Sequence, residues 1–88
     1  MIRQRVIVHG RVQGVFFRDS ARRLAQQHGV SGWVENRWDG TVEAVFEGED
    51  DSVQRLVRFM QEGPRGAEVE RIEVTEERVE GLNGFDVR

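Results

Sequence analysis

Residues 10–19 read GRVQGVFFRD, and the arginine in this run, Arg18, stands at an unusual position. The apolar spacing that follows predicts a helix beginning near Phe16, which puts Arg18 in its first turn. The helix dipole already leaves positive potential at that end, so a guanidinium there costs roughly a few tenths of a kcal/mol unless an anion compensates it. The position of Arg18 therefore predicts a negatively charged ligand at this loop.

Gly14 lies where the chain must turn from a strand into this helix. A glycine adopts positive φ readily, and such a turn lets successive backbone N–H groups converge on an anion in front of a helix N-terminus. Arg18 would add a planar guanidinium that binds two oxygens of a phosphoryl or carboxylate group. The candidate anion-binding residues are Gln13, Gly14, Val15, Phe16, Phe17 and Arg18.

Each part of this loop also has an ordinary structural interpretation. Gly14 alone is usually a turn residue, and Arg18 alone is usually a solvated helix residue. The apolar residues of the loop fit ordinary packing, and Gln13 could either form the turn or orient the loop. Because strand-glycine-helix turns are common, these residues alone leave the anion site open.

Asn36 ends an expected strand at residues 30–36 and is the second candidate. Asparagine is common where a hairpin turn begins, so by itself this position indicates a turn. The two imidazoles, His9 and His28, stand in mid-strand and at a helix end, and no third ligand accompanies them in the sequence. These histidines therefore predict neither a metal site nor a catalytic dyad.

Trp33 and Trp38 fall on the outward side of an expected hairpin, where they could stack nucleic-acid bases. The net charge of −3 argues against the broad basic surface that a nucleic-acid backbone requires. The acidic run EVERIEVTEERVE is typical of a solvated strand face, because a metal-binding loop needs clustered oxygens on a turn. The net charge therefore disfavours a nucleic-acid site, the acidic run predicts no metal site, and any anion site must be local.

The chain has 88 residues, which predicts one domain, residues 1–88, too small for a second lobe or a deep cofactor cleft. It contains no Cys, Lys or Tyr, so thiolate phosphatase chemistry, Schiff-base chemistry and disulfides are excluded. The run MIRQRVIV lacks the apolar stretch of a signal peptide, and no segment has the length of a membrane span. We therefore expect a soluble cytoplasmic protein.

Hydrophobic periodicity predicts the elements that must position these residues. Alternation and helical spacing indicate strands at 4–12, 30–36, 41–47, 67–79 and 85–87, and helices at 16–28 and 51–62. Asp39-Gly40 predicts an antiparallel hairpin between the second and third strands. Each helix has one apolar stripe, so both suit one face of a mainly antiparallel sheet. The predicted fold class is α+β, a ferredoxin-like βαββαβ two-layer sandwich with a short C-terminal extra strand.

Two longer motifs in the chain resemble those of the acylphosphatases. Val8 and the following HGRVQGVFFR match the first, an aliphatic residue, G-x-V-Q-G-V, any residue, an aromatic or Met, and Arg. GWVENRWDGTVEAVFEG matches the second, in which Asn36 is a specified position. GPRGAEV and GFDVR are also similar to the family, so the resemblance covers essentially the whole chain. Glu35 departs from the pattern, but strand alternation should point it to the face opposite Asn36.

The resemblance implies hydrolysis of the carboxyl-phosphate bond of acyl phosphates without a metal or a cofactor. It implies that the amides from Gln13 to Phe17 and the guanidinium of Arg18 bind the phosphoryl group, and that Asn36 positions the attacking water. Inorganic phosphate or sulfate would bind as a product-like ligand. We expect a monomer that acts on a small molecule and has no nucleic-acid or membrane partner.

Two other functions are open at this point. One is a non-catalytic anion- or metabolite-binding module on the same fold, which would bind an acyl phosphate without hydrolysing it. The other is an RNA binder that uses the exposed face of a sheet of related topology. The exposed aromatic and basic residues that such a binder needs are poorly represented in this chain.

Overall fold

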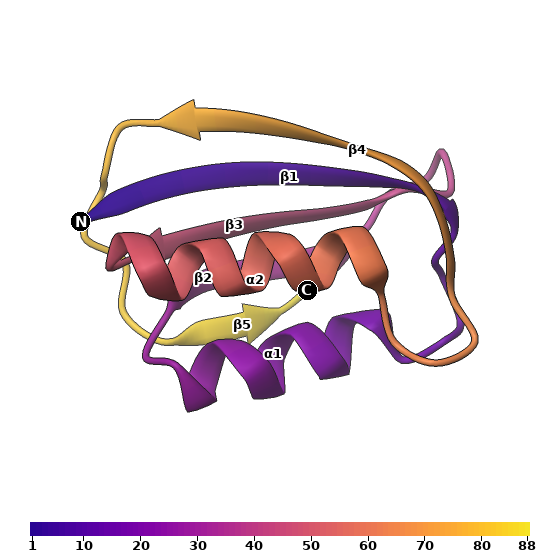
Figure 1. Cartoon of the computed structure of the whole chain (residues 1–88), viewed down its shortest axis with the longest axis horizontal. Coiled ribbons are helices and arrows are strands. Elements are labelled where there is room, and N and C mark those ends of the chain that lie inside the picture. The colour runs from indigo at the N-terminus through magenta and orange to yellow at the C-terminus, as the bar shows by residue number, and fades with distance from the viewer.

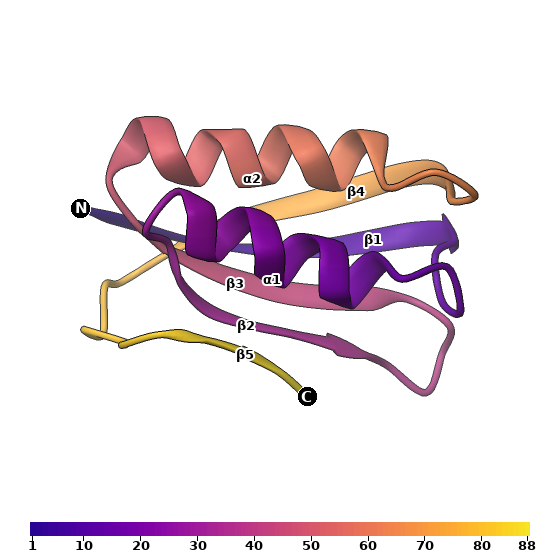
Figure 2. The same ribbon diagram turned by 90° about the horizontal axis from the view of Figure 1, so that it is seen from below.

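The computed structural model describes all residues, 1–88, as two helices on one face of a five-stranded sheet (Figure 1). Figure 2 shows both helices on the same side of the strands. The strand order is β4-β1-β3-β2-β5, and all neighbours are antiparallel except β2 and β5, which are parallel. The elements in chain order are β1 (Ile2–Arg11), α1 (Phe17–Gln27), β2 (Ser31–Asn36), β3 (Val42–Gly48), α2 (Asp50–Glu62), β4 (Glu68–Glu77) and β5 (Phe85–Val87). The predicted α+β sandwich with its extra strand is confirmed.

The first helix begins one residue later than predicted. Phe16 has φ 63 and ψ 25, which is the left-handed region, so it precedes α1 as its N-cap and the helix starts at Phe17. The helix ends before His28, which is followed by Gly29 at φ 68. A glycine adopts this left-handed conformation without strain, which explains the end of the helix. The other bounds differ from the predicted ones by no more than two residues.

The hydrophobic core lies between the sheet and the two helices. In α1, Phe17 is buried and its ring meets Phe59 of α2 edge to face, with ring centroids 5.7 Å apart. Burial of such a side chain contributes about 1.5–3 kcal/mol. This packing fixes the start of α1, and with it Arg18, against the sheet. The core residues are Val6, Val8, Val12, Phe17, Ala21, Ala25, Val30, Val34, Val42, Ala44, Phe46, Val53, Leu56, Val57, Met60 and Phe85.

A buried carboxylate ties the connection between β4 and β5 to the sheet. Glu47 of β3 is fully buried, and its carboxylate accepts hydrogen bonds from the N–H groups of Glu80 at 3.1 Å, Gly81 at 2.6 Å and Leu82 at 3.0 Å. The guanidinium of Arg3, which is 5% exposed, donates to the same carboxylate at 3.1 Å. Sequence periodicity did not predict this cluster, because it forms only when three distant segments meet.

Replacing Glu47 with glutamine is expected to lower the free energy of unfolding by about 2–4 kcal/mol, since it leaves Arg3 buried without its full counter-charge. Burial raises the pKa of Glu47, but the three N–H groups and Arg3 outweigh burial and hold the pKa below its ordinary value. A lowered pKa in the folded state stabilises the protein above the unfolded value of about 4.3, and this contribution is lost as the pH falls through the folded pKa.

Urea unfolding of wild type and Glu47→Gln at neutral and acidic pH measures both effects. The loss of stability in acid should be smaller in the variant, because it lacks the titrating carboxyl. Glu76→Gln, which removes an exposed carboxylate from β4, is the matched control and should change little. Equal stabilities of Glu47→Gln and wild type at neutral pH would show that the buried cluster does not stabilise the fold.

Candidate active site

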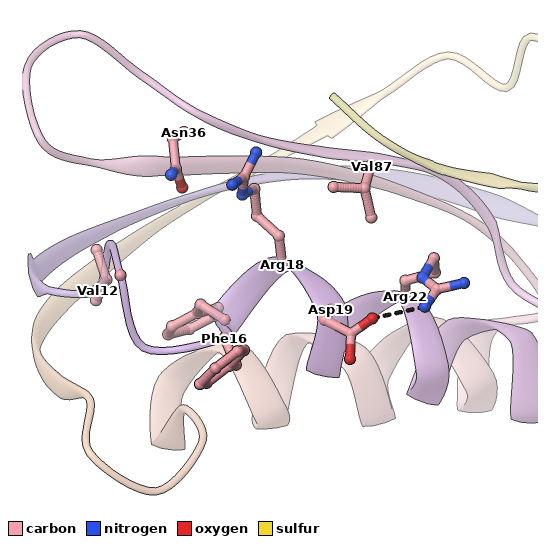
Figure 3. A pocket seen from close by; sticks show the side chains of 9 residues that line it. Val12, Phe16, Arg18, Asp19, Arg22, Asn36 and Val87 are labelled. Atoms are coloured by element: carbon pink, nitrogen blue, oxygen red, sulfur yellow. Dashed lines mark hydrogen bonds and ion pairs between the residues drawn. The ribbon is translucent and has the colours of Figure 1, made fainter.

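A pocket of about 590 Å³ opens where the start of α1, the end of β2 and β5 meet (Figure 3). Arg18 and Asn36 both line it, and Figure 3 shows the guanidinium of Arg18 reaching from the helix toward Asn36 on the strand. Gln13 and Val15 of the predicted loop do not line it. The lining residues are Val12, Gly14, Phe16, Phe17, Arg18, Asp19, Arg22, Asn36 and Val87. The two residues that the sequence indicated separately are therefore neighbours in one pocket.

The loop between β1 and α1 presents unpaired backbone donors. Gly14 has φ 76 and Phe16 has φ 63, so two of its residues are left-handed. None of the N–H groups of residues 13–17 donates a hydrogen bond within the protein. Nothing lies within 4 Å of a Cβ built on Gly14, so glycine is favoured there by its φ rather than by lack of space. A loop of unpaired N–H groups at a helix N-terminus is suited to an anion.

The side chain of Gln13 holds this loop to the turn between β2 and β3. Its amide Nε2 donates to the carbonyl oxygens of Arg37 at 2.7 Å and of Thr41 at 2.9 Å. Both amide hydrogens are thereby used, and the turn that they hold directly follows Asn36. Of the two roles that the sequence left open for Gln13, the structure shows that its side chain orients the loop.

Arg18 is held by main chain that lies far from it in the sequence. Its Nη1 donates to the main-chain oxygen of Arg88 at 2.7 Å, and the N–H of Arg88 donates to the carbonyl oxygen of Val34 at 2.8 Å. This contact aims the guanidinium of Arg18 and uses one of its five N–H donors, which leaves the others for a ligand. Sequence reasoning missed this contact, because nothing local to either residue indicates it.

The side chain of Arg88 lies on the face of the sheet that points away from the pocket. Its guanidinium stacks 4.1 Å from the ring centroid of Trp33 and pairs with Glu35 at 3.6 Å. Arg5 lies 5.6 Å from the centroid of the same ring. Glu35 therefore points to the face opposite Asn36, as predicted. Two guanidinium groups already contact the ring of Trp33, which disfavours its use as a base-stacking surface.

The other charged residues of the pocket compensate one another. The carboxylate of Asp19 accepts a hydrogen bond from Arg22 at 2.6 Å and pairs with Arg23 at 3.0 Å. The hydrogen bond from Arg22 holds the pKa of Asp19 below its ordinary value. Arg22 is thus paired with a side-chain carboxylate, whereas Arg18 has no Asp or Glu partner and contacts the main-chain oxygen of Arg88. Arg18 is the guanidinium of this pocket that remains available to an anionic ligand.

Neither histidine belongs to the pocket. His9 pairs with Glu73 of β4, and His28 lies at the far end of α1. No group of three or more His, Cys, Asp or Glu side chains is arranged to hold a metal ion. Neither helix is both long and apolar enough to span a membrane.

Comparison with known proteins assigns the chain to a family. The acylphosphatase family model matches residues 4–87. An acylphosphatase of Rubrobacter xylanophilus is 61% identical over 98% of this chain and 79% of its own length, and one of Haloarcula marismortui is 52% identical over 98% and 94%. The crystal structure of acylphosphatase from Bacillus subtilis superposes with a TM-score of 0.95 at 40% identity, over 100% of this chain and 99% of that one. The chain belongs to the acylphosphatase family.

Proposed function

We propose that this protein hydrolyses the carboxyl-phosphate bond of acyl phosphates and releases a carboxylate and inorganic phosphate. The observation that carries the proposal is the unpaired N–H groups of residues 13–17 beside Arg18, in a pocket shared with Asn36. This set of groups provides donors for a phosphoryl dianion and an amide for a water molecule. Its occurrence in a member of the acylphosphatase family supports the substrate class.

The loop amides and Arg18 would bind the phosphoryl group. Phosphoryl transfer passes through a largely loose transition state whose charge lies on the peripheral oxygens, so positioning and electrostatic stabilisation supply most of the rate. Backbone N–H groups and a guanidinium both donate to such oxygens, and the guanidinium can donate to two at once. Because the loop is already shaped around its donors, little reorganisation is needed when substrate binds.

Asn36 would align the attacking water. A carboxamide does not titrate near neutral pH, so it orients water through hydrogen bonds and is not a general base. In the proposed step, the water oxygen bonds to phosphorus, the bond from phosphorus to the carboxylate oxygen breaks, and a phosphoryl oxygen accepts the proton. The leaving carboxylate has a conjugate acid with a pKa of roughly 4, so it leaves without a general acid. Neither histidine is needed.

Gln13 would act as a positioning residue. Its two hydrogen bonds join the loop that carries the phosphoryl donors to the turn that follows Asn36. Asp39 stiffens the same turn. Its carboxylate accepts two hydrogen bonds from Thr41, one from the hydroxyl at 2.6 Å and one from the backbone N–H at 3.0 Å. The phosphoryl site and the water site would therefore keep one relative position.

Incubation of the purified protein with benzoyl phosphate in the presence of EDTA tests the proposed function. We expect benzoate and phosphate to appear in equal amounts, at a rate that the chelator does not change and that stays flat through neutral pH. A non-catalytic binding module would instead show saturable binding without product. A rate that follows an apparent pKa of about 6.5 would indicate a histidine in the reaction and contradict the proposed proton path.

The proposed reaction needs no second subunit and no cofactor, because one chain supplies the groups that bind the phosphoryl group and the group that aligns the attacking water. We therefore propose a monomer that uses no resident metal. The expected cytoplasmic location stays a prediction.

A further inference from the structure

Phe16 is a strained and exposed aromatic residue at the edge of the pocket. Its side chain is 81% exposed, and it does not belong to the core. Its φ of 63 places a bulky non-glycine residue in the left-handed region. Both features oppose stability, because strain is stored in the backbone and an apolar ring stays in water. The left-handed backbone suits the anion loop, but a glycine there would serve that purpose without strain.

The geometry of the proposed reaction assigns a use to this ring. In an in-line displacement at phosphorus, the attacking water and the leaving group lie on opposite sides of the phosphoryl group. Asn36 lies on the sheet side of the pocket, whereas Phe16 lies on the helix side, at the start of α1 (Figure 3). A water held by Asn36 therefore directs the leaving carboxylate toward the helix side, where the ring of Phe16 stands.

We propose that Phe16 forms a wall of a subsite for the acyl group and favours substrates with an apolar or aromatic acyl part over acetyl phosphate. This inference rests on the proposed function, because it concerns the second half of the same substrate. Contact with an acyl group removes apolar surface of both partners from water, which stabilises only substrates that are large enough to reach the ring. Phe16 is thus a specificity residue through its side chain, whereas its N–H belongs to the anion loop.

The ratio of kcat/KM for benzoyl phosphate to that for acetyl phosphate tests the inference. Both substrates carry the same phosphoryl group and lose a carboxylate, so effects on the loop amides largely cancel in the ratio. Asparagine tolerates left-handed φ, and Phe16→Asn therefore removes the ring while it preserves the loop. We expect this variant to lower the ratio roughly fivefold. Trp38→Asn removes a ring that is 95% exposed and outside the pocket, and it should leave the ratio unchanged.

Two further variants keep the outcome decisive. Phe16→Gly also removes the ring and releases the backbone strain, so it should lower the ratio even if Phe16→Asn folds poorly. Val87→Ala shortens the exposed apolar side chain on the other side of Arg18 (Figure 3). A ratio that falls in Val87→Ala but not in the Phe16 variants would overturn the inference, as would an unchanged ratio in all of them. Wild-type protein that hydrolyses neither substrate would contradict the proposed function itself.

Discussion

Replacing Arg18 with glutamine is expected to lower kcat/KM for benzoyl phosphate by about a thousandfold. Glutamine keeps a polar N–H donor on a shorter, uncharged side chain, so the variant loses the positive charge and the paired donors. The charge that develops on the phosphoryl oxygens is then stabilised by the loop amides alone. Inorganic phosphate, measured as a competitive inhibitor, should also bind at least about tenfold more weakly, because its charge is already present before reaction.

Arg55→Gln provides the matched control for this loss of charge. Arg55 is exposed on α2, outside the pocket, and has no ion pair. The two variants have the same net charge, so any effect of overall charge on substrate encounter is common to both. Normal activity of Arg18→Gln would show that Arg18 has no role in the reaction. A similar loss in Arg55→Gln would show that the overall charge matters and not the position.

Replacing Asn36 with alanine is expected to lower kcat by about a hundredfold while phosphate still competes with nearly unchanged affinity. The reason is that the amide of Asn36 is proposed to contact the attacking water and not the phosphoryl group. Removing it leaves the loop donors and Arg18 in place but frees the water to take unproductive orientations. The pattern of a lower kcat with unchanged product binding distinguishes this role from that of Arg18.

Asn83→Ala is the matched control, because Asn83 is an exposed asparagine in the connection between β4 and β5. Thermal unfolding should accompany the kinetics, since Asn36 also directly precedes a turn. Loss of folding in Asn36→Ala with normal activity of the remaining folded fraction would favour the turn-residue interpretation. A parallel loss of phosphate affinity would instead place Asn36 among the phosphoryl-binding groups.

Local patterns in the sequence were enough to predict the architecture. Alternation in β1 put Val6 and Val8 on the buried face, and the stripe of α1 put Phe17 and Ala21 there, because both periods are properties of the backbone. Glycine marked the end of α1 for the same local reason. The loop before α1 could also be predicted, since strand, glycine and helix follow one another directly.

Contacts between distant segments could not be predicted from the sequence. The hydrogen bond from Arg18 to Arg88 depends on β5 lying beside β2, and the ladder of three residues that places it there has no strong local signal. Glu47 stands in an ordinary alternating strand, and its burial follows from the chain that covers it. The left-handed backbone of Phe16 was also missed, because its residue type favours packing and not a turn.

Amide NMR of the wild-type protein during a titration with inorganic phosphate tests most directly whether the loop and Arg18 form the phosphoryl site. We expect saturable shifts of the N–H signals of residues 13–17 and of the Arg18 side chain, and their loss in Arg18→Gln. The signals of Arg55 should stay unchanged. Phosphate that binds while the loop signals remain fixed would contradict the proposed site.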